Sequence, residues 1–339
     1  LIVTGVQTCA LPISQGPDVA TIPSFAIQSI EVLRDGAAAQ YGSDAIAGVI
    51  NFNLKDNSSG FAMALNSGQY FEGDGQGYTV SANVGLPLGD NDFLSISGEI
   101  DQQDFSERAH QYCDTWYCVD KDNPIFQSVV ARGDQRADYV LGVPTPGLTA
   151  YENGLQLLYP AGVSRASVAG KNVMPWGQPN VESARFFYNA GIELDNGMEL
   201  YSFGNYSTSK GDGSFFNRYP GNGTIEVLRN ADGSFYSPLE KFTGGFTPRF
   251  EGEIEDIGVA GGIRGDNDGG FSYDASLRYG SNEIDYRLWN TVNPSYGTDS
   301  PTDFRPGVLV NEELQFQLDF ANEIDTGMGS PLVFGYGVS

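Results

Sequence analysis

The sequence predicts an all-β protein: about nine long strands form part of a transmembrane antiparallel β-barrel, preceded by a small α/β head. Three observations predict this fold. Nine segments alternate between apolar and polar residues with a period of two, most run about 10–14 residues, and the turns between them are alternately short and long. A tilted strand of roughly 9–11 residues crosses a bilayer. Short turns at one rim and long loops at the other are typical of outer-membrane barrels.

The composition agrees with this fold and excludes other classes. The 339 residues contain 18 Lys and Arg against 43 Asp and Glu, a net charge of −25. Such a chain is repelled by phosphate backbones, which argues against nucleic-acid binding. No run of 18 apolar residues is present, so a transmembrane helix is not expected. The 21 Phe, 18 Tyr and 3 Trp argue against disorder.

Residues 1–14 are interpreted as foreign to the protein. The segment VTGVQTCALPI, residues 3–13, resembles the translation of a sequencing-library adapter. A natural strand or a signal peptide is the alternative, but the segment lacks the basic start and uninterrupted apolar stretch of a signal peptide. We therefore leave these residues, with Cys9, out of the fold and expect the natural N-terminus to lie elsewhere.

Residues 15–56 predict a compact α/β head. Ile30, Val32 and Leu33 indicate a short buried strand, and residues 37–39 one helical turn. Residues 46–54 indicate a second strand. A unit of this size is too small to hold a core alone, so we expect it to pack against the rest of the chain.

Residues 60–339 predict the barrel part. In each strand one set of side chains faces each side of the sheet. The strand at 198–210 alternates least cleanly, so its facing stays open. The expected strands are 61–71, 77–88, 92–105, 183–194, 198–210, 253–264, 270–281, 312–324 and 331–338.

The connections predict which end of each strand faces outward. Short, Asp- and Gly-rich turns lie at 89–92, 195–197, 265–269 and 325–330, where tight hairpins need positive φ. Long extracellular loops are expected at 106–182, 211–252 and 282–311. A soluble β-sandwich would have shorter strands and no such sorting, so we favour the membrane barrel.

The head carries a family resemblance. It contains IEVLRDG at 30–36, QYGS at 40–43 and AIAGVIN at 45–51. These motifs together resemble the final part of the plug domain of TonB-dependent outer-membrane receptors, although the commonest family pattern has Gly-Pro at 35–36. The positions that match the plug motif, counting the Asp-Gly variant, are Glu31, Arg34, Asp35, Gly36, Tyr41, Gly42 and Asn51.

The resemblance implies an architecture and a function. A plug sits inside a 22-stranded barrel of the Gram-negative outer membrane, so this chain is expected to be a fragment: the end of a plug and the first part of a barrel. The implied function is active import of a nutrient, such as a siderophore or a carbohydrate. The implied partners are the TonB complex, through a segment before this one, and outer-membrane lipid and lipopolysaccharide. A passive porin or adhesin barrel and a secreted carbohydrate-active β-protein are the alternatives.

Single residues of the head allow two interpretations. In the family, Glu31 and Arg34 would make a charge contact between plug and barrel; a surface ion pair of little energy is the alternative. Tyr41 and Gly42 are interpreted as backbone geometry, since Gly permits tight turns. Asn51 is expected to bond backbone inside the plug.

No catalytic site, metal site or cofactor is expected. Cys113 and Cys118 form a C-x4-C pair that favours a local disulfide, with two free thiols as the alternative. The one histidine, His110, cannot complete a zinc site or an acid–base pair with them. The segment at 266–269 is interpreted as a hairpin turn rather than a calcium loop.

The predicted loops are rich in aromatic residues, which suit sugars, aromatic chelators or cobalamin-like ligands. Self-packing of the loops is equally compatible, so they do not identify a substrate. They are Tyr112, Trp116, Tyr117, Tyr139, Tyr151, Tyr159, Trp176, Phe215, Phe216, Tyr219, Phe235 and Tyr236.

Residues 15–339 expressed alone are expected not to insert stably into a membrane. Nine strands leave two sheet edges whose unpaired N–H and C=O groups lipid cannot satisfy. The measurement is the yield of heat-resistant, membrane-integrated barrel. Recovery of such a barrel would contradict the expectation.

Overall fold

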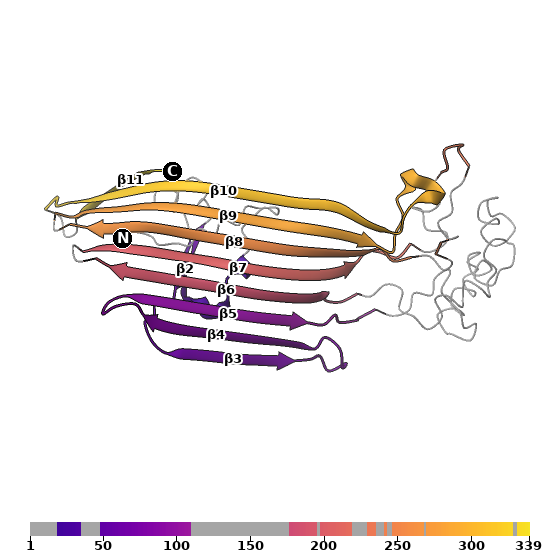
Figure 1. Ribbon diagram of the computed structural model, residues 1–339, viewed down its shortest axis with the longest axis horizontal. Helices are drawn as coiled ribbons and strands as arrows, with labels where there is room; N and C mark the ends of the chain where they lie inside the picture. The colour runs from indigo at the N-terminus through magenta and orange to yellow at the C-terminus, as the bar shows by residue number, and fades with distance from the viewer. Residues whose placement is uncertain are drawn as a thin grey trace.

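The described residues form two antiparallel sheets, one of two strands and one of nine (Figure 1). The computed structural model describes residues 19–34, 48–109, 176–194, 197–218, 229–234, 241–242, 246–267, 269–327 and 331–339. None of the helices within these residues is long and apolar enough to cross a membrane.

The small sheet forms the head, together with two short 3-10 helices. Helix η1 (Val19–Thr21) and helix η2 (Ser24–Ala26) lead directly into β1 (Ile27–Arg34). Strand β1 pairs with β2 (Gly48–Leu54), so that Glu31 lies opposite Asn51. The two predicted strands of the head are confirmed.

The large sheet is a meander in which each strand pairs with its neighbour in sequence. This confirms the nine predicted strands and the partial antiparallel barrel. The strands are β3 (Phe61–Gly68), β4 (Gly77–Pro87), β5 (Phe93–Gln103), β6 (Asn180–Glu193), β7 (Met198–Ser214), β8 (Arg249–Asp266), β9 (Phe271–Trp289), β10 (Asp303–Ile324) and β11 (Leu332–Val338).

Several strands run further toward the long connections than predicted. Strand β9 ends at Trp289 and β10 begins at Asp303, so the loop expected at 282–311 is reduced to 290–302. This connection contains the 3-10 helix η4 (Pro294–Asp299). The loop expected at 211–252 likewise shortens, to 215–248. These two predicted loop ranges were wrong because the first and last residues of each range belong to the flanking strands.

The two faces of the large sheet differ in polarity, as predicted. Ile100, Leu277 and Phe316 are 57%, 53% and 55% exposed on the convex face. Ser97 and Asp274 face the other side and are buried. One face is therefore an apolar wall and the other a polar lining.

Strand β7, whose facing the sequence left open, fits the same scheme. Its register places Leu200 opposite Ile192 and Tyr206 opposite Phe186, all of which belong to the apolar convex face. Phe203, on the other face, packs against buried residues of the head. The poor alternation of β7 thus arises from aromatic residues on both sides.

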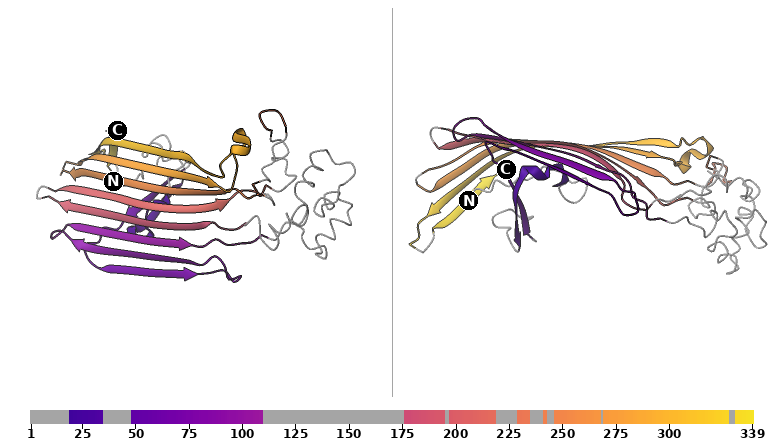
Figure 2. Two further views of the ribbon diagram at one scale, coloured as in Figure 1. Left: turned by 45° about the vertical axis from the view of Figure 1, so that its right-hand side comes forward. Right: turned by 90° about the horizontal axis from the view of Figure 1, so that it is seen from below.

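The large sheet curves over the head, which lies on its concave side (Figure 2). The head strand predicted to be buried is not: Ile30 and Val32 are 54% and 59% exposed. No described element covers that face of β1. The helical turn expected at 37–39 lies outside the described residues.

Leu277→Arg is expected to lower folding stability in a bilayer by about 2–4 kcal/mol, because it places a charge in the middle of the apolar convex face. The measurement is denaturant unfolding of the complete barrel in lipid. Glu283→Arg on the same strand and face, beyond the apolar residues, is the control and is expected to change stability little. Equal effects of the two changes would contradict the assignment of the apolar face.

Candidate functional site

The candidate site is the place where the head rests on the concave face of the large sheet (Figure 2). Helix η2 carries the contact. The Ser24 hydroxyl donates to Oε2 of Glu99 on β5 at 2.6 Å, and the Ser24 backbone N–H donates to the same atom at 3.3 Å. We call this contact the plug seat.

Glu99 is held by the sheet as well as by the head. Arg185 on β6 donates to its Oε1 at 2.8 Å, and the Ser81 hydroxyl on β4 donates to its Oε2 at 2.8 Å. The side chains of Arg185 and Glu99 are only 16% and 10% exposed. A buried charge pair needs hydrogen bonds to the carboxylate oxygens to offset the loss of water. The two bonds from Ser24 to Oε2 of Glu99 therefore help to stabilise the pair.

An apolar contact lies beside this polar one. Ile22 and Ala26 of the head pack with Phe187 of β6, and these three side chains are 6%, 3% and 2% exposed. Leu54 and Phe203 border this cluster. Burial of this cluster stabilises the contact without fixing its direction. The directional hydrogen bonds to Glu99 set the position of the head on the sheet.

The chain that leaves the head is fixed separately. The Lys55 N–H donates to the Ala26 carbonyl, and Asn189 of β6 donates to the Lys55 carbonyl at 3.0 Å. Asn57 donates to Asn83 at 3.1 Å and accepts from Ser95 at 2.8 Å. The passage from head to sheet is therefore bonded to β4, β5 and β6.

The plug-motif residues that the structure describes lie away from this seat. Glu31 and Arg34 are exposed, and neither forms an ion pair with another described residue. Asn51 donates to Glu31 at 3.4 Å and to Asn53 at 3.1 Å, which are side chains of β1 and β2, and its expected bond to backbone stays a prediction. The expected charge contact of Glu31 and Arg34 with the barrel stays a prediction.

The other predicted site residues fall outside the described part of the chain. In the part that is described, no three His, Cys, Asp or Glu side chains are arranged to hold a metal ion. The residues outside it are Asp35, Gly36, Tyr41, Gly42, His110, Cys113 and Cys118.

Glu99, the charge that joins head and sheet, is not among the site residues predicted from the sequence. It stands in SISGEID, where the apolar convex residues Ile96 and Ile100 alternate with polar concave ones. That alternation indicates that Glu99 faces inward. Its register partner Arg185 cannot be recognised without the strand pairing, because 77 predicted loop residues separate the two strands in sequence.

A second polar cluster ties the β3–β4 turn to the strand ends at the long-loop rim. The Arg108 guanidinium donates to both oxygens of Asp74 at 2.9 and 2.7 Å and lies 4.8 Å above the Tyr70 ring. The Glu107 N–H adds a bond to Asp74 at 2.6 Å. The Arg108 bonds, followed by the Glu107 bond, hold the pKa of the Asp74 carboxyl below its usual range.

Comparisons with known proteins agree with the head and the sheet. The family model described as TonB-dependent Receptor Plug Domain matches residues 3–49. This range includes part of the segment attributed to an adapter, an attribution that stays a prediction. The "Iron-regulated outer membrane virulence protein" of Vibrio cholerae serotype O1, from two strains, is 38% identical over 109 residues. That match covers 30% of this chain and 17% of the relative.

The fold is also similar to a solved structure. A ferric enterobactin receptor variant from Pseudomonas aeruginosa, in complex with enterobactin, aligns with a TM-score of 0.50 and 18% identity. The alignment covers 96% of this chain and 37% of that one, and it shows likeness of fold alone.

The sheet and the head seated on it define an outer-membrane β-barrel with an internal plug, of which this chain spans a part. Residues 3–49 match the plug domain of TonB-dependent receptors, and the chain is similar to an outer-membrane protein over 109 residues.

Glu99→Gln is expected to speed hydrogen exchange of residues 22–27 in the complete receptor by roughly tenfold or more. Hydrogen bonds to a charged group contribute about 1.5–3 kcal/mol, and the change leaves Arg185 without its counter-charge. Glu253→Gln, an exposed change on the convex face, is the control. Unchanged exchange in Glu99→Gln would show that the charge does not hold the head.

Acid is expected to loosen the β3–β4 turn only below about pH 4. A carboxyl whose pKa is lower in the folded protein than its unfolded-state value of about 3.9 stabilises the fold above that pH. The stabilisation is lost as the pH falls through the folded-state pKa. Asp74→Asn should therefore raise hydrogen exchange of residues 69–76 at pH 7 and remove the acid response. Asp90→Asn at the opposite rim is the control. An identical acid response in Asp74→Asn and the unchanged receptor would contradict this cause.

Proposed function

We propose that the whole receptor imports an iron–siderophore complex across the outer membrane, driven by the inner-membrane TonB complex. Support comes from the plug-family match and from the iron-regulated Vibrio relative. The solved receptor of similar fold is one for ferric enterobactin. Because the matches span only a small share of these proteins, substrate and partner are inferences for this chain.

The plug seat is the observation that carries the mechanism. A plug that must move needs a docking surface that is specific but reversible. A few charge-assisted bonds centred on Glu99, beside a small apolar cluster, provide this combination. A mechanical pull on the head would break the Ser24 bonds, while Arg185 would keep the carboxylate paired in the sheet. The displaced state is thereby less costly than one with a lone buried charge.

The bonds of residues 55–57 define where such movement would stop. Asn57 is bonded to Asn83 and Ser95, and a Cβ at Gly85 would overlap Asn57 and Ser59. This close packing fixes the C-terminal end of the head on the sheet. Displacement would therefore begin at helix η2 and β1 and leave the passage into β3 in place.

The proposal is tested by iron uptake in a Gram-negative host that lacks its own siderophore receptors. The complete receptor is expected to support uptake of radioactive iron from at least one ferric siderophore only while TonB is functional. Uptake that persists without TonB would favour a passive pore. Growth on an oligosaccharide, with no uptake from any ferric siderophore, would favour carbohydrate import.

A further inference from the structure

A hollow lies in the convex face of the large sheet, over strands β4 to β7. Its volume is about 380 Å³. Seven of the residues that line it have side chains on the convex face, and none of the seven is charged. They are Val80, Ala82, Gly98, Ile100, Ala184, Phe186 and Tyr206. The hollow is therefore apolar, and it opens onto the surroundings of the convex face.

Small residues form the floor of the hollow. Ala82 and Gly98 stand opposite each other on β4 and β5, and Ala184 on β6 continues the floor toward the long loops. A Cβ at Gly98 would come near one atom only, the Arg185 carbonyl oxygen at 3.8 Å. The space above Gly98 is thus free for an occupant.

Large residues form the two walls of the hollow. On one side Ile100 stands opposite Val80, and on the other Phe186 stands opposite Tyr206. Ile100, Phe186 and Tyr206 are 57%, 44% and 42% exposed, so they rise above the floor on either side of it. The hollow is an oblique groove between two apolar ridges.

The groove lies directly behind the plug seat. Ser81, Glu99 and Arg185 each stand in sequence between two residues of the groove, with their side chains on the concave face. Glu99 and Arg185 also line the groove. Because their side chains bond to each other on the concave face, they contribute main chain to the floor. An occupant of the groove would therefore touch the main chain of the seat residues.

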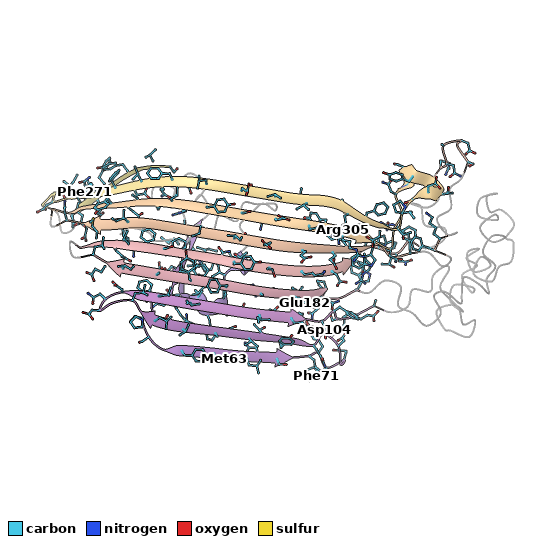
Figure 3. All side chains as sticks on the ribbon, in the orientation of Figure 1. Met63, Phe71, Asp104, Glu182, Phe271 and Arg305 are labelled. Atoms are coloured by element: carbon cyan, nitrogen blue, oxygen red, sulfur yellow. The ribbon has the colours of Figure 1, made fainter. Side chains whose placement is uncertain are left out.

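The groove lies in the half of the apolar band that is nearer the long loops. Figure 3 labels Glu182 and Asp104 at the long-loop ends of β6 and β5. Glu182 is only two residues from Ala184 and on the same face. The Tyr206 hydroxyl donates to Oε2 of Glu255 at 3.3 Å, as expected of a tyrosine where hydrocarbon meets polar groups. With the long loops outside, as predicted, the groove faces the outer leaflet.

A cation stands at the edge of the groove toward the long loops. Lys210 lies four residues beyond Tyr206 on the same strand and face, opposite Glu182. Its half-exposed ammonium is 3.2 Å from Oε1 of Glu251. An ammonium has three donors, so Lys210 can also bond a lipid phosphate.

Shape decides what fills a groove that faces hydrocarbon. Lipid tails are as apolar as the groove itself, so the hydrophobic effect does not favour one apolar occupant over another. An unfilled groove instead loses the dispersion contacts of the atoms that line it. A straight, saturated chain restores these contacts along the floor. The outer leaflet of a Gram-negative outer membrane consists of lipopolysaccharide, whose acyl chains are saturated.

We propose that the groove binds one acyl chain of lipopolysaccharide against the back of the plug seat. The inference concerns the lipid around the barrel and does not depend on which substrate is imported. Because the chain would lie on the main chain of Glu99 and Arg185, the bound lipid supports the strands that carry the seat.

The test maps cross-links from a photoreactive acyl chain to the complete receptor. The receptor is reconstituted in phospholipid vesicles that contain lipopolysaccharide with a diazirine on one acyl chain. Peptides that contain Gly98 or Ala184 are expected to be labelled roughly tenfold more than the peptide that contains Leu277, which faces lipid outside the groove. A phospholipid with the same diazirine should label the three peptides about equally.

Variants that fill the groove provide the matched comparison. Gly98→Leu and Ala184→Leu each place a side chain over the floor, and each is expected to abolish the excess labelling of the other residue's peptide. Gly261→Leu is the control: it lies on the convex face of β8 outside the groove, and a Cβ there would meet nothing closer than 3.7 Å. Heat resistance of the barrel shows that each variant folds, and the unmodified receptor tests the site without any variant.

Three results would overturn the inference. The first is labelling of the groove no higher than that of the Leu277 peptide. The second is excess labelling that persists in the folded Gly98→Leu and Ala184→Leu receptors. The third is an equal excess from the phospholipid probe, which would show that the groove does not select lipopolysaccharide.

Discussion

The structure depends on one constraint: the large sheet keeps an unbroken hydrogen-bond register from β3 to β9. In hydrocarbon every backbone N–H and C=O must be paired within the protein, which a continuous sheet achieves across its interior. A slip of one residue would exchange the two faces of a strand. The register therefore decides which side chains meet lipid, which meet the plug and which meet the outside.

The plug seat follows from this register. Because Ile96 and Ile100 must point outward, Glu99 points inward, and the pairing of β5 with β6 brings Arg185 beside it. The sheet thus presents a paired carboxylate whose remaining lone pairs accept from the head. Ser24 completes the set without adding a second charge. Such a contact orients the plug and can be broken without leaving either charge alone.

Much of the fold could be predicted from the sequence, and the errors have a common cause. The nine strands were recognised because one face of each is apolar. Their outer ends were missed on β8 and β9 because the alternation reverses there: after Tyr279 the apolar residues of β9 stand at even positions, as at Ile284 and Tyr286. Where the apolar residues move from one face of a strand to the other, the alternation breaks and the sequence resembles a loop. The strand nevertheless continues with the same pairing.

The site was less predictable than the fold. The plug motif identified the head, but its motif residues Glu31 and Asn51 bond to each other, and the contact with the sheet falls on Ser24. A serine at the start of a short 3-10 helix has no distinctive sequence pattern. Glu99 is one of 43 acidic residues, and only the strand pairing distinguishes it. The roles of Ser24 and Glu99 depend on tertiary contacts, which no local sequence pattern predicts.

The most direct measurement is a reversible cross-link across the seat. Ala26→Cys and Phe187→Cys, which pack together across the seat and leave Ser24, Glu99 and Arg185 in place, are combined in the complete receptor, in a background without other cysteines, and joined by a short disulfide-forming bifunctional reagent. The account predicts that the link forms in the resting receptor, stops TonB-dependent iron uptake, and releases it again on reduction. Failure of the link to form, or full uptake by the linked receptor, would contradict it.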